Sequence, residues 1–195
     1  MKKCSVDLVT GFLSSGKTTF INVFLKKTLK GEETIVVRCE SGKEEFNEII
    51  KNKGNLSIKN FISGKELTEE RFIRMVKFYK PERMIIECNG IEDIDYLTNL
   101  FNTVKLRSYF RITGMINMID ASTFSMLLKN LGHLVLPCLE RSDLIIFNKA
   151  SEISEEKVDV DLNIIKNLNN HAHILVAYDK SDLEKKINKA KVINA

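Results

Sequence analysis

The sequence Gly11-Phe-Leu-Ser-Ser-Gly16-Lys17-Thr18 decides the fold of this chain, because it has the G-x-x-x-x-G-K-[ST] spacing of a phosphate-binding loop. The apolar stretch Val6–Thr10 precedes it and is typical of a short buried strand. Thr19–Leu29 follows it with apolar residues at helical spacing. A strand, a glycine-rich turn and a helix in this order form the setting in which such a loop binds phosphate.

The physical basis of the motif is a concavity lined by successive backbone N–H groups, to which the positive end of the following helix adds its field. Lys17 is the expected catalytic cation, placed to reach the β- and γ-phosphates, and the Thr18 hydroxyl is the expected Mg²⁺ ligand. We therefore expect a set of loop residues to bind the nucleotide: Gly11, Ser14, Ser15, Gly16, Lys17, Thr18 and Thr19.

The rest of the chain alternates strand-like and helix-like segments. Further strands are predicted at Thr34–Cys39, Leu56–Ile62, Met84–Cys88, Ile112–Ile119, Leu144–Phe147 and Ile174–Ala177. Helices are predicted at Glu44–Lys51, Leu67–Tyr79, Ile94–Val104, Phe124–Leu131 (ending near Gly132), Val158–Leu168 and Leu183–Val192, with a less regular helical piece at Pro137–Arg141. This order predicts an α/β protein of the P-loop NTPase type, with a mostly parallel sheet, helices on both faces and a single domain over 1–195.

The amino-acid composition limits the classes of partner that we expect for this chain. The 195 residues are 44% apolar and 29% charged, as in an ordinary globular domain, and the net charge of +4 comes from lysines scattered among acids. We therefore expect no nucleic-acid partner. Since no apolar run reaches a membrane-spanning length, we expect no membrane association. The four cysteines are far apart and form no C-x-x-C pair, which favours buried thiols in a reducing, cytoplasmic setting.

Polar residues at strand ends are the remaining site candidates, because ligands of such sheets bind beyond the carboxyl ends of the strands. Glu87 and Gly90 follow one strand: Glu87 would organise Mg²⁺ or orient the attacking water, and Gly90 could bring its N–H near the γ-phosphate. Glu40-Ser-Gly42 follows another strand, where a segment that senses the γ-phosphate and the metal belongs. For both segments an ordinary turn is the alternative.

Asn148-Lys149-Ala150-Ser151 follows a later strand, at the place where GTP-binding proteins have Asn-Lys-x-Asp. Asn148 would brace the loop and Lys149 would pack on the base. Ser151 replaces the aspartate, so the contact with guanine loses its charge assistance, unless Glu152 substitutes. Asp120 could either cap the next helix or act in the site. His171 and His173 could bind a metal weakly or be plain surface residues.

Taken together, these segments resemble the CobW/HypB/UreG class of P-loop GTPases, and its CobW branch most. The matching segments are G-F-L-S-S-G-K-T-T-F at Gly11–Phe20, E-S-G at Glu40–Gly42, E-x-x-G at Glu87–Gly90, I-D-A-S-T-F at Ile119–Phe124 and F-N-K at Phe147–Lys149. The resemblance implies GTP (alternatively ATP) and Mg²⁺ as ligands, slow hydrolysis, and a switch or chaperone role in delivering metal or a cofactor to a client metalloprotein or cofactor-dependent enzyme. Family members often dimerise, and the chain itself leaves a homodimer open.

The chain departs from the family pattern at three places. The stretch Asn60–Leu67, where the CobW branch usually has C-x-C-C, contains no cysteine. The aspartate of the base motif is Ser151, and the sequence ends after the nucleotide domain. Two alternatives to a GTPase therefore stand: a nucleotide-binding adaptor without significant turnover, and a P-loop ATPase or small-molecule kinase, for which no arginine-rich lid is evident.

Overall fold

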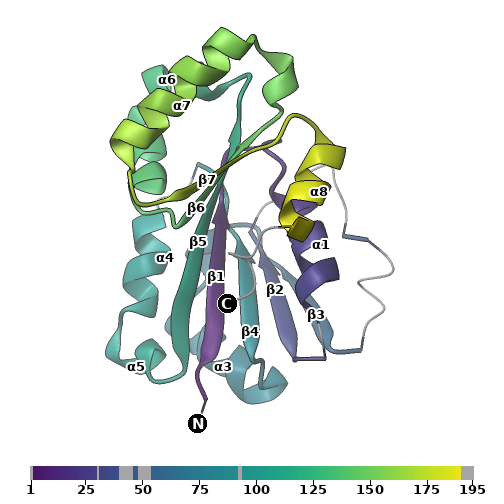
Figure 1. The fold of residues 1–195 in the computed structure, drawn as a ribbon. Helices are drawn as coiled ribbons and strands as arrows, with labels where there is room; N and C mark the ends of the chain where they lie inside the picture. The colour runs from purple at the N-terminus through teal and green to yellow at the C-terminus, as the bar shows by residue number, and fades with distance from the viewer. Residues whose placement is uncertain (1, 30, 40–45, 48–53, 92–93, 190–195) are drawn as a thin grey trace.

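A seven-stranded parallel sheet forms the centre of the molecule in the computed structural model, which describes residues 2–29, 31–39, 46–47, 54–91 and 94–189. The strand order is β3-β2-β4-β1-β5-β6-β7 (Figure 1). The strands are β1 (Cys4–Thr10), β2 (Thr34–Arg38), β3 (Leu56–Asn60), β4 (Arg83–Glu87), β5 (Phe110–Asp120), β6 (Leu144–Asn148) and β7 (His173–Val176). All six pairings are parallel, so every carboxyl end lies at the same edge.

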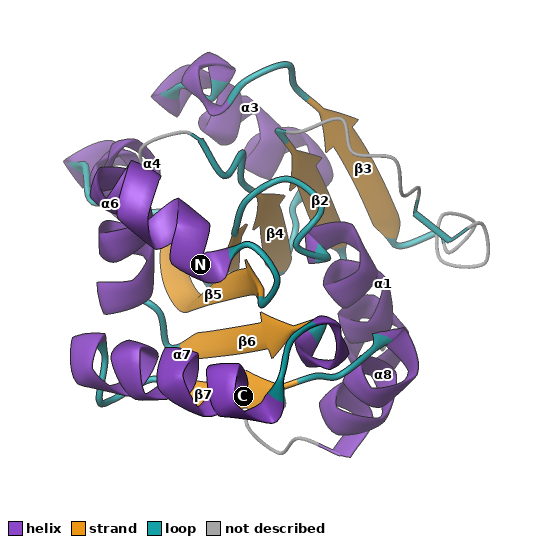
Figure 2. Cartoon of the chain, turned by 90° about the horizontal axis from the view of Figure 1, so that it is seen from above, coloured by secondary structure: helices purple, strands orange, loops and turns teal. Residues whose placement is uncertain are grey.

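Helices cover both faces of this sheet, as the view from above shows (Figure 2). One face carries α1 (Lys17–Thr28) and α8 (Lys180–Lys189). The other carries α3 (Glu69–Tyr79), α4 (Ile94–Phe101), α5 (Val104–Arg107), α6 (Phe124–Glu140) and α7 (Glu155–Leu168). The predicted α/β class, the parallel sheet and the two helical layers are confirmed.

The alternation of side chains along each strand divides the core between the two faces. On β1, Val9 packs with α1, whereas Leu8 packs with α3, α4 and α5. On β6, Ile146 joins the α1 side and Phe147 joins α6 and α7. Because both faces are covered, the inner strands are apolar almost throughout, and a charged side chain in one of them is conspicuous.

The structure corrects one predicted helix and extends another. The helix that begins at Phe124 is broken at Leu131 (φ −129°, ψ 32°), next to Gly132 as predicted, and a second helical segment follows the break to Glu140 and includes the piece predicted around Pro137; the two segments together are labelled α6. The single helix predicted over Ile94–Val104 is two helices, because the Thr103 hydroxyl accepts a hydrogen bond from the Leu106 amide and starts α5 anew. The helix predicted at Glu44–Lys51 lies outside the described residues, apart from Phe46 and Asn47, which are not helical.

The topology fixes where the site forms. Strand β1 lies between β4 and β5, so its carboxyl end is flanked by the ends of both. The chain reverses its direction of sheet growth here, and open α/β sheets bind ligands at such a point. The loops after β1, β4 and β5 therefore meet at the carboxyl end of β1, and they carry the phosphate-loop motif, Gly90 and Asp120, which the sequence indicated as site candidates. Within the described residues, no helix is both long enough and apolar enough to cross a lipid bilayer.

Candidate nucleotide site

The loop between β1 and α1 has the backbone of an anion cradle. Gly11, Ser14 and Gly16 all have positive φ, at 133°, 66° and 102°. Gly11 cannot carry a side chain, because a Cβ there would lie 2.2 Å from the carbonyl oxygen of Met118. Among the hydrogen bonds of the described residues, none is donated by the amides of Leu13, Ser14 or Gly16. These N–H groups are thus available to a phosphate.

Two loop side chains add to the fit for an anion. The Ser15 hydroxyl is buried and has no hydrogen-bond partner in the described part of the chain. The Lys17 ammonium group is also buried and donates to the carbonyl oxygens of Gly11 (2.6 Å) and Phe12 (3.0 Å). A lysine folded onto its own loop holds positive charge where phosphate oxygens would arrive. Because the loop carbonyls are neutral acceptors, phosphate oxygens would compete with them effectively.

Thr18 and Glu87 meet next to the loop. The Thr18 hydroxyl donates to Oε1 of Glu87 at 2.5 Å, and both side chains are buried. A hydroxyl that gives its proton to a carboxylate keeps its oxygen lone pairs for another contact. Hard cations such as Mg²⁺ take oxygen ligands and are commonly bound through one or two protein groups plus phosphates. This donor set therefore fits Mg²⁺: Thr18 would ligate the ion directly, and Glu87 would act through its hydrogen bond with Thr18.

Gly90 lies against the phosphate loop. A Cβ at Gly90 would lie 2.3 Å from the Gly11 carbonyl oxygen and 2.6 Å from Cα of Phe12. Gly90 therefore lies next to the phosphate loop, because the loop after β4 packs directly against the loop after β1. The other predicted strand-end segment, Glu40–Gly42, lies outside the described residues.

Asn148 and Lys149, at the end of β6, also lie beside the phosphate loop. The Asn148 side-chain amide donates to the Ser15 carbonyl oxygen at 2.9 Å and is buried, so it braces the phosphate loop. Lys149 has a left-handed backbone (φ 58°) and its ammonium group contacts Oδ2 of Asp120 at 2.5 Å. Oδ1 of Asp120 accepts hydrogen bonds from the amide and hydroxyl of Ser122. Asp120 therefore does not cap α6, whose N-cap residue is Thr123; it anchors Lys149 instead.

Ser151 stands where the Asn-Lys-x-Asp motif has its aspartate, and it is hydrogen-bonded to the backbone of the loop after β7. The Ser151 hydroxyl donates to the Tyr178 carbonyl oxygen at 2.6 Å, and the Ser151 amide points to the same oxygen at 3.3 Å. Ser151 is exposed and keeps only its oxygen lone pairs for a base, and Glu152 is exposed beside it. The base end of the site is thus neutral at residue 151.

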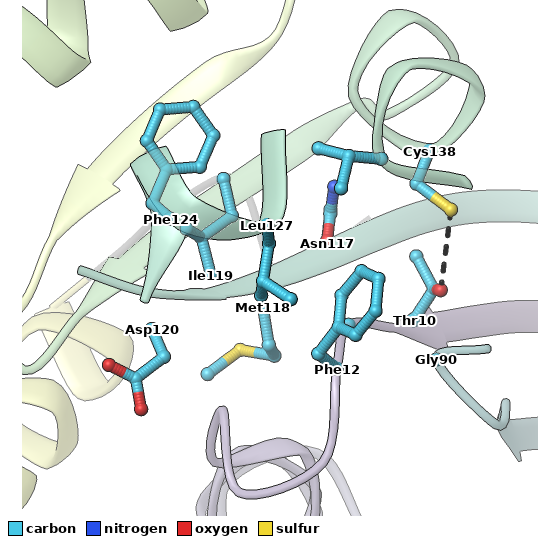
Figure 3. Close-up of a pocket in the computed structure, with 12 residues that line it drawn as sticks. Thr10, Phe12, Gly90, Asn117, Met118, Ile119, Asp120, Phe124, Leu127 and Cys138 are labelled. Carbon is cyan, nitrogen blue, oxygen red and sulfur yellow. Dashed lines mark hydrogen bonds between the residues drawn. The ribbon is translucent and has the colours of Figure 1, made fainter. Parts of the chain in front are cut away.

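A small cavity lies beside the phosphate loop, under α6 (Figure 3). Its lining joins Phe12 of the loop, the end of β5 and apolar residues of α6, and at one side the Thr10 hydroxyl and the Cys138 thiol are 3.6 Å apart. Most of the lining side chains are apolar: Phe12, Met118, Ile119, Phe124, Leu127 and Val135. Such a surface offers few donors to a phosphate, so we assign the cavity to the packing between loop and helix.

The structure shows no thiolate or imidazole centre in its described residues. All four cysteines are buried and free, and burial, followed by the neighbouring Cys39 and Cys138, raises the pKa of the Cys88 thiol well above its ordinary value. His171 precedes β7 and His173 begins it, and both are exposed. Within the described ranges, no three His, Cys, Asp or Glu side chains are grouped to hold a metal ion.

Arg38 is the residue that the sequence analysis missed. It ends β2, is 8% exposed, and its Nε lies 3.3 Å from Oε2 of Glu87. A signal was present, since a charge within the run T-I-V-V-R-C of a central strand requires a buried partner. The pairing itself depends on strand register, which places Arg38 beside Glu87.

Comparisons with known proteins agree with this geometry. The family model described as CobW/HypB/UreG, nucleotide-binding domain, matches residues 5–176. Two curated relatives, each called zinc-regulated GTPase metalloprotein activator 1, are 24% identical: one from Dictyostelium discoideum over 89% of this chain and 46% of its own length, and one from Schizosaccharomyces pombe over 87% and 44%. The chain therefore spans about half the length of these relatives.

Solved structures with the same fold include a Zn(II)-bound YjiA GTPase from E. coli, with a TM-score of 0.66 and 20% identity over 89% of this chain and 57% of that one. The hydrogenase maturation factor HypB from Archaeoglobus fulgidus has a TM-score of 0.65 and 19% identity over 96% of this chain and 88% of that one. At these identities the likeness establishes the fold alone. The family match covers most of the chain and includes the phosphate loop, Glu87 and Asn148, and on that basis the chain belongs to the CobW/HypB/UreG family.

Proposed function

We propose that this chain binds a purine nucleoside triphosphate, with GTP as the preferred ligand, and hydrolyses it slowly. The observation that carries the proposal is the loop Gly11–Thr18. Its residues with positive φ, and its backbone N–H groups that donate no hydrogen bond among the described residues, form an anion cradle beside Lys17. The close packing of Gly90 and the hydrogen bond from Asn148 hold this cradle in place before any ligand arrives. Such preorganisation lowers the cost of binding.

The chemistry would rest on charge neutralisation rather than on a covalent intermediate. Lys17 would leave the Gly11 and Phe12 carbonyls and contact the β- and γ-phosphate oxygens. Thr18 would hold Mg²⁺, which when bound supplies further positive charge at these oxygens. Glu87, at the end of β4, would keep Thr18 in its ligating orientation. The Glu40–Gly42 segment is proposed as a second contact to the metal and as the element that senses the γ-phosphate.

The base end of the site supports a preference for guanine that is weaker than that of a site with an aspartate. Asp120 contacts the Lys149 ammonium group, and we expect the aliphatic stem of Lys149 to pack on a purine ring. Ser151 offers a neutral acceptor to the guanine amino and imino groups. Neutral hydrogen bonds are about half as strong as charge-assisted ones, so we expect ATP to bind as well, though less tightly.

The biological role that we propose is a nucleotide-controlled switch for a client metalloprotein or cofactor-dependent enzyme. This follows the names of the relatives, which are a GTPase metalloprotein activator and a hydrogenase maturation factor. The described residues contain no metal-holding cluster, so the nucleotide state, and not a thiolate centre in these residues, is the proposed means of control. We further propose a cytoplasmic location, no nucleic-acid or membrane partner, and a homodimer as one form of the switch.

Calorimetry with GDP, GTP, ADP and ATP, with and without Mg²⁺, tests the proposal directly. We expect the guanine nucleotides to bind more tightly, Lys17→Ala to abolish binding, and Lys26→Ala, an exposed lysine on the same helix, to have no effect. Affinity that survives in Lys17→Ala would count against the cradle. Phosphate release by the wild type separates slow turnover from an adaptor that only binds. Label moving from the γ-phosphate to a metabolite would favour a kinase instead.

A further inference from the structure

Arg38 has no role in the proposed function, although it lies beside the proposed nucleotide site. It ends β2 next to Glu87, with 3.3 Å between its Nε and Oε2 of Glu87. On another side its guanidinium carbon lies 5.5 Å from the centre of the buried Phe46 ring. Removing two charges from water costs several kcal/mol per ion, and a hydrophobic pair of similar volume often stabilises a protein as well or better. Fold stability alone therefore gives little reason for an ion pair at this edge.

The two oxygens of Glu87 have different partners. Oε1 accepts the proton of the Thr18 hydroxyl at 2.5 Å, and Oε2 faces Arg38. The contact between Arg38 and Oε2 is an ion pair without hydrogen-bond geometry, and its attraction favours the orientation in which Oε2 faces Arg38 and Oε1 faces Thr18. The hydrogen bond to Oε1 would leave the Thr18 oxygen lone pairs free to ligate Mg²⁺. A carboxylate free to rotate would leave the Thr18 hydroxyl able to turn away.

We infer that Arg38 is a positioning residue of the nucleotide site, which acts on Mg²⁺ binding through Glu87 and Thr18. The inference rests on the proposed function and decides between two roles that the sequence leaves open for Glu87. Because Oε1 accepts the Thr18 proton and Oε2 faces Arg38, these contacts favour the role in which Glu87 organises the metal ligand over the one in which it orients the attacking water. Arg38 would thus act on the metal side of the site through Glu87, which contacts Thr18.

The experiment measures how Mg²⁺ changes nucleotide affinity, by titrating Mg²⁺ against a fluorescent GTP analogue bound to each variant. In Arg38→Ala we expect the Mg²⁺ concentration for half-maximal effect to rise about tenfold, in the range found for groups that orient metal ligands. Affinity measured in EDTA should change less than twofold, because the loop amides and Lys17 are untouched. Arg38→Lys should recover part of the Mg²⁺ dependence, since it keeps the charge but lacks the planar fork.

Arg83 provides a control at the amino ends of the strands, opposite the proposed nucleotide site. Its Nε lies 3.4 Å from Oε1 of Glu32, and its guanidinium carbon is 5.5 Å from the centre of the Phe24 ring, so it has the same kinds of neighbour as Arg38, although Glu32 is more exposed than Glu87. Arg83→Ala removes the same kind of contact at the amino end of β4, away from the nucleotide. It should leave the Mg²⁺ titration unchanged.

A double variant separates a positioning role from a general loss of structure. Arg38→Ala leaves the Glu87 charge without this partner and could unfold the chain, whereas Arg38→Met with Glu87→Gln removes both charges together. If Arg38 acts through Glu87, the double variant should show the Mg²⁺ dependence of Glu87→Gln alone. Additive effects, or a wild-type titration in Arg38→Ala, would overturn the inference while nucleotide binding stands. A wild type that binds no nucleotide would remove the proposed function and this inference with it.

Discussion

Gly90→Ala tests the site with the smallest possible change, a single methyl group. The added Cβ would lie 2.3 Å from the Gly11 carbonyl oxygen and 2.6 Å from Cα of Phe12, both of them backbone atoms. Ordinary contacts begin near 3.4 Å, so one of the two loops must move by about 1 Å in an interior that is already close-packed. No rotation of a side chain relieves the clash, because the opposing atoms belong to the main chain.

Overpacking of this kind costs about 1–3 kcal/mol in the free energy of unfolding. In a chain of this length each kcal/mol lowers the Tm by about 2–4 °C. Because the displaced segment is the phosphate loop, we also expect nucleotide affinity to fall by at least about tenfold, which is about 1.4 kcal/mol. GDP and GTP should lose affinity equally, since the loop amides cradle the α- and β-phosphates that both contain.

The assay compares urea unfolding and calorimetric Kd values of wild type, Gly90→Ala and Gly54→Ala. Gly54 is the control, because a Cβ there meets no atom within 4 Å and its backbone is not left-handed. It should be neutral or slightly stabilising. If Gly90→Ala loses affinity for GTP but not for GDP, Gly90 serves the γ-phosphate through its N–H, and the packing argument is wrong. An unchanged Kd for both nucleotides would refute the proposed contact between the two loops.

Three further predictions follow from single features. Ser151→Asp cannot donate to the Tyr178 carbonyl, so its carboxylate should turn to the base and raise the ratio of GDP to ADP affinity about tenfold in calorimetry; an unchanged ratio would place the base elsewhere. Burial raises the pKa of Asp7, an effect partly offset by the Thr113 hydrogen bond, so the folded state binds that proton more tightly. The free energy of unfolding should therefore fall as pH rises from about 4, and urea titrations of Asp7→Asn between pH 4 and 7 should lack that part of the decline; parallel curves would contradict this. Burial raises the pKa of Cys4 to about 12, and all four thiols are buried, so Ellman's reagent should react slowly with the native chain and with four thiols in urea.

The phosphate loop could be predicted from sequence because its geometry is a local property. Positive φ at Gly11 and Gly16 and the cradle of amides depend on a few consecutive residues and on the strand and helix beside them. The break within α6 could be predicted in the same way, because Gly132 is a common helix stop and helical geometry is lost at Leu131, next to it. The sequence did not show that a second helical segment follows this break directly, with Val135, Cys138 and Leu139 buried in the core.

The contacts that complete the site could not be read from sequence, because they depend on register between distant strands. Arg38 and Glu87 are opposite each other only because β2 pairs with β4 at that offset, and a shift by one residue would point Arg38 to the other face. Asp120 meets Lys149 for the same reason, since Asp120 pairs with Asn148 at the ends of β5 and β6. Sequence motifs therefore identify the groups that touch a ligand, whereas the groups that orient them come from the sheet. Substitutions at Arg38 and Asp120 should for this reason alter how tightly metal and base are held, while the phosphate loop itself keeps its shape.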